Sequence, residues 1–128
     1  MTRERQDLGQ LGESVARTYL RKQGFKIVAT NVRSPLGELD IVAREGSTLV
    51  FVEVRTKATG AFGRPEASVN LRKQRQVVRA AQRYLATTVR RAVACRFDVV
   101  AVTMPEDGGP PALDHIRDAF PAEGLPLF

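Results

Sequence analysis

The sequence predicts an α/β protein in which helices flank a mixed β-sheet. Segments with helical spacing of apolar residues alternate along the chain with short apolar runs typical of strands. The predicted order is one helix, three strands, a long helix and two further strands, which is typical of a layered α/β domain. The chain has 128 residues, of which 43% are apolar, enough for one domain with its own core. We expect this domain over residues 1–120 and a loosely ordered tail over residues 121–128.

The first predicted element is an amphipathic helix over about residues 5–22. Its apolar residues recur at spacings of three and four, at Leu8, Leu11, Val15 and Tyr19. Gly24 follows the helix as a C-terminal stop. Residues 25–30 then predict a short strand, and residues 31–35 predict a loop that contains Asn31, Ser34 and Pro35.

Residues 38–44 and 48–57 predict the two strands of a β-hairpin. Gly46-Ser47 is a suitable two-residue loop because glycine favours the first central position of a type II′ turn. In this register Glu45 faces Thr48, and Asp40 lies opposite Glu53. The second strand is apolar on both faces, which is typical of a central strand covered on both sides.

The same register gathers charged side chains on one face of the hairpin, namely Glu38, Asp40, Glu53, Arg55 and Lys57. The facing carboxylates of Asp40 and Glu53 repel each other unless a cation neutralises them. Mg²⁺ or Mn²⁺ would do so, because both ions take oxygen ligands. The alternative is that both acids are salt-bridge partners, and we interpret Glu38 first as a cross-strand ion-pair partner of Arg55.

The second half of the chain predicts a loop over residues 59–65 and a long helix from residue 67 or 70 to residue 88 or 90. The apolar side of this helix carries Leu71, Val77, Val78, Ala81, Tyr84 and Leu85, and the opposite side is cationic. Residues 96–102 predict another strand, and residues 113–120 predict a short edge strand. We interpret Asp98 as a structural partner of a neighbouring arginine.

The net charge of +6 and the pI of about 10.2 favour a polyanionic partner such as nucleic acid. The single cysteine, Cys95, excludes an internal disulfide, and the isolated His115 argues against a zinc site. No apolar run approaches the length of a membrane span, and the polar start lacks a signal-peptide pattern. We therefore expect a cytoplasmic protein with no membrane partner.

Several motifs in this order resemble the YraN family, small bacterial proteins predicted to have a restriction-endonuclease-like fold related to archaeal Holliday-junction resolvases. The resemblance covers about residues 8–120. The matching residues are Gly12-Glu13, Ala16, Tyr19-Leu20, Gly24-Phe25, Asn31, Gly37-Glu38-Leu39-Asp40, Phe51-Val52-Glu53-Val54-Arg55, Lys73-Gln74, Ala81, Tyr84-Leu85 and Arg96-Phe97-Asp98-Val99-Val100.

The resemblance implies a site of the PD-(D/E)xK type. Asp40 matches the first acid, and Glu53-Val54-Arg55 matches the triplet, with arginine in the usual place of lysine. Arginine can hold phosphate but cannot transfer a proton. Lys57 lies two residues further on the same face. The implied catalytic residues are Asp40, Glu53, Arg55 and Lys57, and the implied metal ligands are Glu13, Asp40, Glu53 and the carbonyl of Val54.

The function implied is a Mg²⁺- or Mn²⁺-dependent nuclease that hydrolyses phosphodiester bonds in DNA, with branched or flap structures as the expected substrates. The expected nucleic-acid contacts are Arg64, Arg72, Lys73, Gln74, Arg75 and Arg79. Two other classes stay open: a nucleic-acid-binding module without turnover, because of Arg55, and a subunit whose basic face docks an acidic protein. Glu13 suits a solvated helix position as well as a ligand position. Because related resolvases act as dimers, the resemblance is also compatible with a homodimer.

Overall fold

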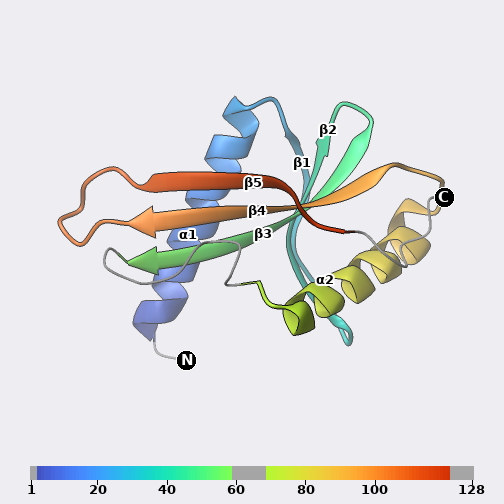
Figure 1. The fold of residues 1–128 in the computed structure, drawn as a ribbon, viewed down its shortest axis with the longest axis horizontal. Coiled ribbons are helices and arrows are strands. Elements are labelled where there is room, and N and C mark those ends of the chain that lie inside the picture. The colour runs from blue at the N-terminus through green and yellow to red at the C-terminus, as the bar shows by residue number, and fades with distance from the viewer. Residues whose placement is uncertain (1–2, 59–68, 122–128) are drawn as a thin grey trace.

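The fold was analysed in a computed structural model that describes residues 3–58 and 69–121 (Figure 1). The loop predicted over residues 59–65, with Arg64, lies outside the described residues, as do residues 122–128 of the predicted tail. Within the described segments, no helix combines the length and the hydropathy that crossing a membrane requires.

The elements follow the predicted order, which confirms the α/β class. They are α1 (Arg3–Lys22), β1 (Lys26–Ser34), β2 (Gly37–Glu45), β3 (Thr48–Ala58), α2 (Leu71–Tyr84), the π-helix η2 (Leu85–Val89), β4 (Cys95–Met104) and β5 (Ala112–Phe120). This arrangement is consistent with the restriction-endonuclease-like core that the resemblance implies.

The five strands form one mixed sheet in the order β1-β2-β3-β4-β5. All neighbouring pairs are antiparallel except β3 and β4, which are parallel and are connected through α2. A parallel pair requires such a crossover connection. β3 lies in the middle of the sheet, as predicted from its two apolar faces, and β5 is an edge strand. Figure 1 shows the sheet strongly twisted, with β1 and β2 running steeply across β3, β4 and β5.

The two long helices cover opposite faces of the sheet, which gives the domain two apolar layers (Figure 1). The layer under α1 contains Ala16, Leu20, Phe25, Ile41, Ala43, Val50, Val52, Val54, Val100 and Val102. The layer under α2 contains Leu39, Val42, Leu49, Phe51, Val77, Ala81, Tyr84, Leu85, Phe97, Val99 and Phe120, among others. The even residues of β3 therefore face α1, and its odd residues, including Glu53, face α2.

The predicted loop after residue 30 is wrong, because β1 continues to Ser34 and the turn to β2 follows that residue. Asn31 lies inside the strand with a φ of 50°. Asparagine tolerates this left-handed conformation better than most residues. The polar residues that predicted a loop therefore belong to a strand with a local irregularity.

The predicted apolar stripes of both helices need partial correction. Leu11 of α1 and Leu71 of α2 are exposed to 54% and 64%, so neither is a core residue. The buried line of α1 consists of Gly12, Ala16 and Leu20, with Val15 and Tyr19 at its edge. Small side chains let the helix come close to the sheet, and this close contact sets its rotation.

Gly12 is the point of closest approach between α1 and β3. A Cβ atom at this position would overlap the side-chain oxygen of Thr56. Contacts this short do not occur between real side chains, so only glycine fits here without a shift of the helix. The next residue is Glu13, and its position therefore depends on this contact.

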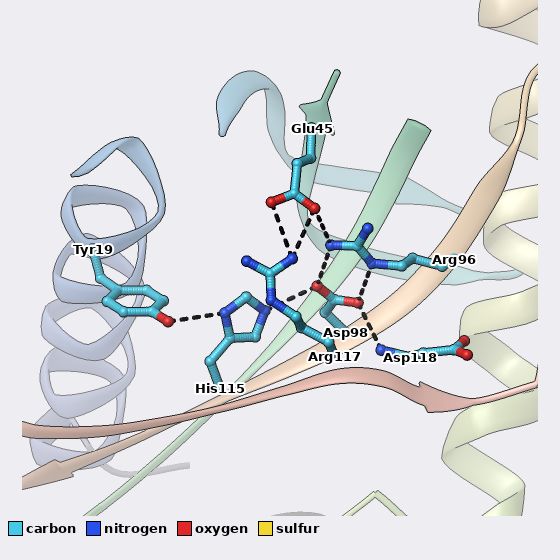
Figure 2. A network of polar contacts seen from close by, with 7 residues as sticks. All are labelled: Tyr19, Glu45, Arg96, Asp98, His115, Arg117 and Asp118. Atoms are coloured by element: carbon cyan, nitrogen blue, oxygen red, sulfur yellow. Dashed lines mark hydrogen bonds and ion pairs between the residues drawn. The ribbon is translucent and has the colours of Figure 1, made fainter. Parts of the chain in front are cut away.

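Asp98 is a fully buried carboxylate on the α1 side of β4 (Figure 2). It accepts hydrogen bonds from Arg96 Nε at 2.9 Å and from the backbone N–H of Asp118 at 3.0 Å, and His115 Nε2 lies 2.9 Å from its second oxygen. Tyr19 Oη lies 3.0 Å from His115 Nδ1, so a His115 ring protonated at Nε2 satisfies both contacts. The structural role predicted for Asp98 is confirmed.

The same network fastens the turn between β2 and β3 to the neighbouring strands. Glu45 precedes this turn, and its carboxylate accepts from Arg96 Nη2 at 2.8 Å and from Arg117 Nη1 at 2.7 Å (Figure 2). Strands β2, β4 and β5 are thus joined by side chains at one end of the sheet.

We expect Gly12→Ala to destabilise the fold by about 1–3 kcal/mol, because the new methyl group meets Thr56 and forces α1 away from β3. Urea unfolding followed by circular dichroism measures the loss. Gly9→Ala is the matched control, because no atom lies within 4 Å of a Cβ there, and it should gain roughly 0.5–1 kcal/mol from helix propensity. Equal effects of the two changes would contradict the close contact.

We expect Asp98→Asn to destabilise the protein by about 3–5 kcal/mol at pH 7, because it leaves buried partners of a charged group without their acceptor. Burial raises the pKa of Asp98, but hydrogen bonds from His115 and Arg96 outweigh it and lower this pKa below 3.8. The stability that the ionised Asp98 adds to the fold is fully present above pH 3.8. It is lost as the pH falls through the lowered pKa of Asp98. Unfolding curves of the variant and the wild type should therefore converge in acid, whereas the exposed Asp114→Asn should change little at any pH.

Candidate functional site

The candidate site lies where the ladder between β2 and β3 ends. The ladder runs from Glu45–Thr48 to Ile41–Val52, which confirms the predicted register. Gly46 has a φ of +60°, as a type II′ turn requires. The next opposed residues are Asp40 and Glu53, and the ladder does not reach them. The backbone N–H of Val54 donates instead to Asp40 Oδ2 at 2.9 Å.

Glu53 is a buried carboxylate with an unsatisfied oxygen. Its relative exposure is 1%, and Oε1 has no hydrogen-bond partner in the described structure. Burial, together with the charge of Asp40, raises the pKa of Glu53 to about 8. The pKa of Asp40 is also raised, mainly by burial, and the hydrogen bond from Val54 opposes this rise. A cation is strongly stabilised beside a buried carboxylate oxygen that accepts no hydrogen bond.

A lysine approaches this acid pair from α2 and not from β3. Lys73 Nζ lies 3.5 Å from Glu53 Oε1. The start of the helix is fixed by Asn70, whose side chain accepts from the backbone N–H of Lys73 at 2.9 Å, and by Gln74, whose amide donates to the carbonyl of Val69 at 2.8 Å. These caps hold Lys73 in the first turn of α2, where its side chain points toward the sheet.

Glu13 reaches the same region from the other helix. Burial raises its pKa, and the charges of Asp40 and Glu38 raise it further. With its amide oriented to satisfy both contacts, Asn31 donates to Glu38 Oε1 at 3.0 Å and to Glu13 Oε2 at 3.3 Å. Glu13 is thus half-buried and close enough to Asp40 for the charge of that acid to raise its pKa.

Of the remaining predicted site residues, some lie near Asp40 and Glu53 and others lie further away. Arg55 is close enough to Asp40 for its charge to lower the pKa of that acid. Lys57 lies further along the same face, half-buried, and makes no ion pair with any described residue. Glu38 lies 3.8 Å from Arg33 of β1, so its cross-strand ion pair is with β1, on the side away from β3.

The predicted nucleic-acid contacts on α2 form two groups, one exposed to solvent and one turned toward the sheet or the helix start. Arg72, Arg75 and Arg79 are exposed on the outer side of the helix. Lys73 belongs instead to the acid pair, and Gln74 is occupied in holding the helix start. The exposed arginines keep a cationic surface beside the site.

No three His, Cys, Asp or Glu side chains converge as a ready-made metal cluster anywhere in residues 3–58 and 69–121. The donor chemistry nevertheless fits a hard divalent cation. Asp40 has one oxygen outside its bond to Val54, and Glu53 Oε1 is buried without a hydrogen bond. A cation between these oxygens would offset the burial that raises both pKa values and the charge of Asp40 that further raises the pKa of Glu53. Glu13 could add a ligand directly or through water.

The sequence did not predict two features of the site. It predicted Lys73 and Gln74 as the residues of the long helix that reach the scissile phosphate, but not the ion pair of Lys73 with Glu53, and it left Asn31 in a loop. The ion pair was not predicted because the register of a helix against a sheet depends on packing, which the sequence does not display. The role of Asn31 depends on a left-handed backbone that propensity alone does not predict.

Comparison with known proteins identifies the family of the chain. Residues 12–102 match the profile described as Uncharacterised protein family UPF0102, a span that includes Glu13, Asp40, Glu53 and Lys73. The chain belongs to this family, which is the YraN family of the resemblance.

Relatives named UPF0102 protein match nearly the whole chain. The relative from Geotalea daltonii is 47% identical over 88% of this chain and 88% of its own. Those from Syntrophotalea carbinolica and Moorella thermoacetica are 46% and 42% identical, over 97% and 94% of this chain and 99% and 100% of their own.

We expect Glu53→Gln to remove a pH dependence of stability measured in EDTA. A raised acid pKa makes the folded state bind the proton more tightly, so wild-type stability falls as the pH rises from 4.5 to about 8. The neutral amide of glutamine causes no such loss. The free energy of unfolding of the variant should therefore exceed that of the wild type at pH 8 by up to roughly 4 kcal/mol. Thermal unfolding at pH 5 and pH 8 measures both, with the more exposed Glu38→Gln as control. Parallel profiles for Glu53→Gln and the wild type would contradict the burial of a charge.

Proposed function

We propose that this protein is a Mg²⁺- or Mn²⁺-dependent nuclease that hydrolyses phosphodiester bonds in DNA, with branched or flap DNA as the expected substrate. The observation that supports it most is the buried Glu53 beside the half-buried Asp40, with an oxygen of Glu53 that accepts no hydrogen bond and a lysine 3.5 Å from it. Acids held close together in such surroundings are frequent at functional sites.

Asp40 and Glu53 would hold the metal, with Glu13 and the Val54 carbonyl as further ligands. When bound, the metal lowers the pKa of water and neutralises charge on the phosphate. The chain itself supplies orientation, because the Val54 N–H fixes Asp40 and the close contact at Gly12 brings up Glu13. Water would attack phosphorus and form a new P–O bond while the P–O bond to the leaving sugar oxygen breaks. The proton lost by the attacking water would pass to solvent, and the leaving oxygen would take up a proton from solvent.

Lys73 would take the position that lysine usually has on the strand, where this chain has Arg55. An ammonium beside the acid pair can orient the attacking water or stabilise phosphoryl oxygens. Arg55 would then hold phosphate, for which its planar fork is suited. The exposed Arg72, Arg75 and Arg79 would bind the backbone of the DNA next to the cleavage point and carry little sequence information.

A nucleic-acid-binding module without turnover is the second candidate. One observation favours it: Glu53 already has a cationic neighbour in Lys73, so the site is partly neutralised without a metal. The two candidates differ in whether the DNA is cut when a metal is present.

We expect the wild type to cut a labelled four-way junction or flap in Mn²⁺ and not in EDTA. Asp40→Asn and Glu53→Gln should each lose at least about 100-fold in cleavage rate, and Lys73→Met roughly 10²–10³-fold, as for loss of one electrostatic stabiliser. Product formation on denaturing gels measures the rates, and binding to the same DNA is measured in parallel.

The matched control is Lys57→Met, an equal loss of charge on the same face, which should reduce cleavage far less than Lys73→Met. Titration calorimetry should show Mn²⁺ binding to the wild type and weaker binding to Asp40→Asn. DNA binding without cutting, with no effect of Mn²⁺, would favour the module. Cutting that survives Asp40→Asn would show that another enzyme is responsible.

A further inference from the structure

Two hollows lie where α2 continues into η2, on the same side of the sheet as the acid pair. One has a volume of about 160 Å³ between β1 and α2, and the other has about 360 Å³ near the turn between β2 and β3. Tyr84 and Thr88 line both, so the hollows are neighbours that share a wall. Neither belongs to the site described above, although Leu39, next to Asp40 in sequence, lines the smaller one.

Each hollow is lined by two arginines and, among the described residues, by no acid. Arg33 and Arg83 line the smaller hollow, and Arg44 and Arg91 line the larger one. Arg33 makes only a long contact of 3.8 Å with Glu38, and its side chain is 82% exposed. Within the described segments the other three make no ion pair. Four arginines from separate parts of the chain thus line the two hollows, with most of their hydrogen-bonding capacity open among the described residues.

The π-helix brings these groups together. The backbone N–H of Arg90 donates to the carbonyl of Leu85 at 2.8 Å, which closes the wide turn. Arg90 then adopts a left-handed conformation with a φ of 58°, uncommon for arginine. The chain reverses at this residue, so that Arg91 and Val93 line the larger hollow opposite Thr88. Wide turns of this kind inside helices are frequent at functional sites.

Hydroxyl groups stand beside the arginines in both hollows, and the rest of the lining is mostly apolar. Ser47 and Thr88 line the larger hollow with Arg44 and Arg91, and Ser34 and Thr87 line the smaller one. Arginine together with serine and threonine hydroxyls is the usual donor set for phosphate oxygens of a nucleic-acid backbone. The hollows are too small to hold a protein helix.

We propose that these two hollows bind backbone phosphates of the DNA at a distance from the cleavage point. This inference rests on the proposed function, since it assumes a nucleic-acid substrate at Asp40 and Glu53. Ten residues of helix separate Lys73 from Arg83, or about 15 Å at 1.5 Å per residue. The DNA would pass from the acid pair along the exposed arginines of α2 and end in the hollows.

The test measures binding of a fluorescein-labelled four-way DNA junction in EDTA by anisotropy, from 50 to 300 mM salt. Arg83→Gln/Arg91→Gln removes one cation from each hollow. Its affinity should fall about 10-fold at 100 mM salt, and the slope of log K against log salt should fall by about 1.8, for two phosphate contacts. Arg83→Lys/Arg91→Lys should retain most of the slope because the charges remain.

The matched control is Arg21→Gln/Lys22→Gln, which makes the same change in net charge at the exposed end of α1 on the opposite face. It should change affinity less than about 2-fold. A wild type that binds and an Arg83→Gln/Arg91→Gln variant that behaves like this control would overturn the inference and leave the proposed nuclease intact. A wild type that binds no DNA at low salt would overturn both. Circular dichroism confirms that each variant is folded.

Discussion

The burial of the Glu53 carboxylate beside Asp40, where the ladder between β2 and β3 ends, is the constraint on which the other features of the site depend. Apolar side chains cover β3 on both faces, so the charge of Glu53 cannot be relieved by water. It must be relieved by a proton, by Lys73 or by a bound cation. The caps at the start of α2 and the glycine contact of α1 both place polar groups around this single charge.

The two buried acids of the sheet illustrate different uses of the same residue type. Asp98 receives a hydrogen bond or ion pair on each oxygen, and its pKa is lowered. Glu53 keeps one oxygen without a hydrogen bond, and its pKa is raised. A satisfied buried carboxylate stabilises a fold, whereas an incompletely satisfied one costs stability and is retained where binding or chemistry requires it.

Local patterns predicted much of this structure. The hairpin register followed from Gly46-Ser47, and the opposition of Asp40 and Glu53 followed from that register. The central place of β3 followed from its two apolar faces. Three features were not predicted: the exposure of Leu11, the continuation of β1 through Asn31 and the ion pair of Lys73 with Glu53. Each depends on how a helix or strand packs against distant residues. The family resemblance implied that Asp40 and Glu53 hold a metal. It also put the cation of the motif on β3, at Arg55.

The bond between the Val54 amide and Asp40 has a mechanical consequence. A charged side-chain oxygen takes the place that a peptide carbonyl occupies elsewhere in the sheet, so the strength of this rung varies with ionisation. When Asp40 gains a proton the rung weakens and the strand ends loosen; when the carboxylate is ionised they tighten. The ionisation of Asp40 and the rigidity of the neighbouring backbone are therefore linked through this hydrogen bond.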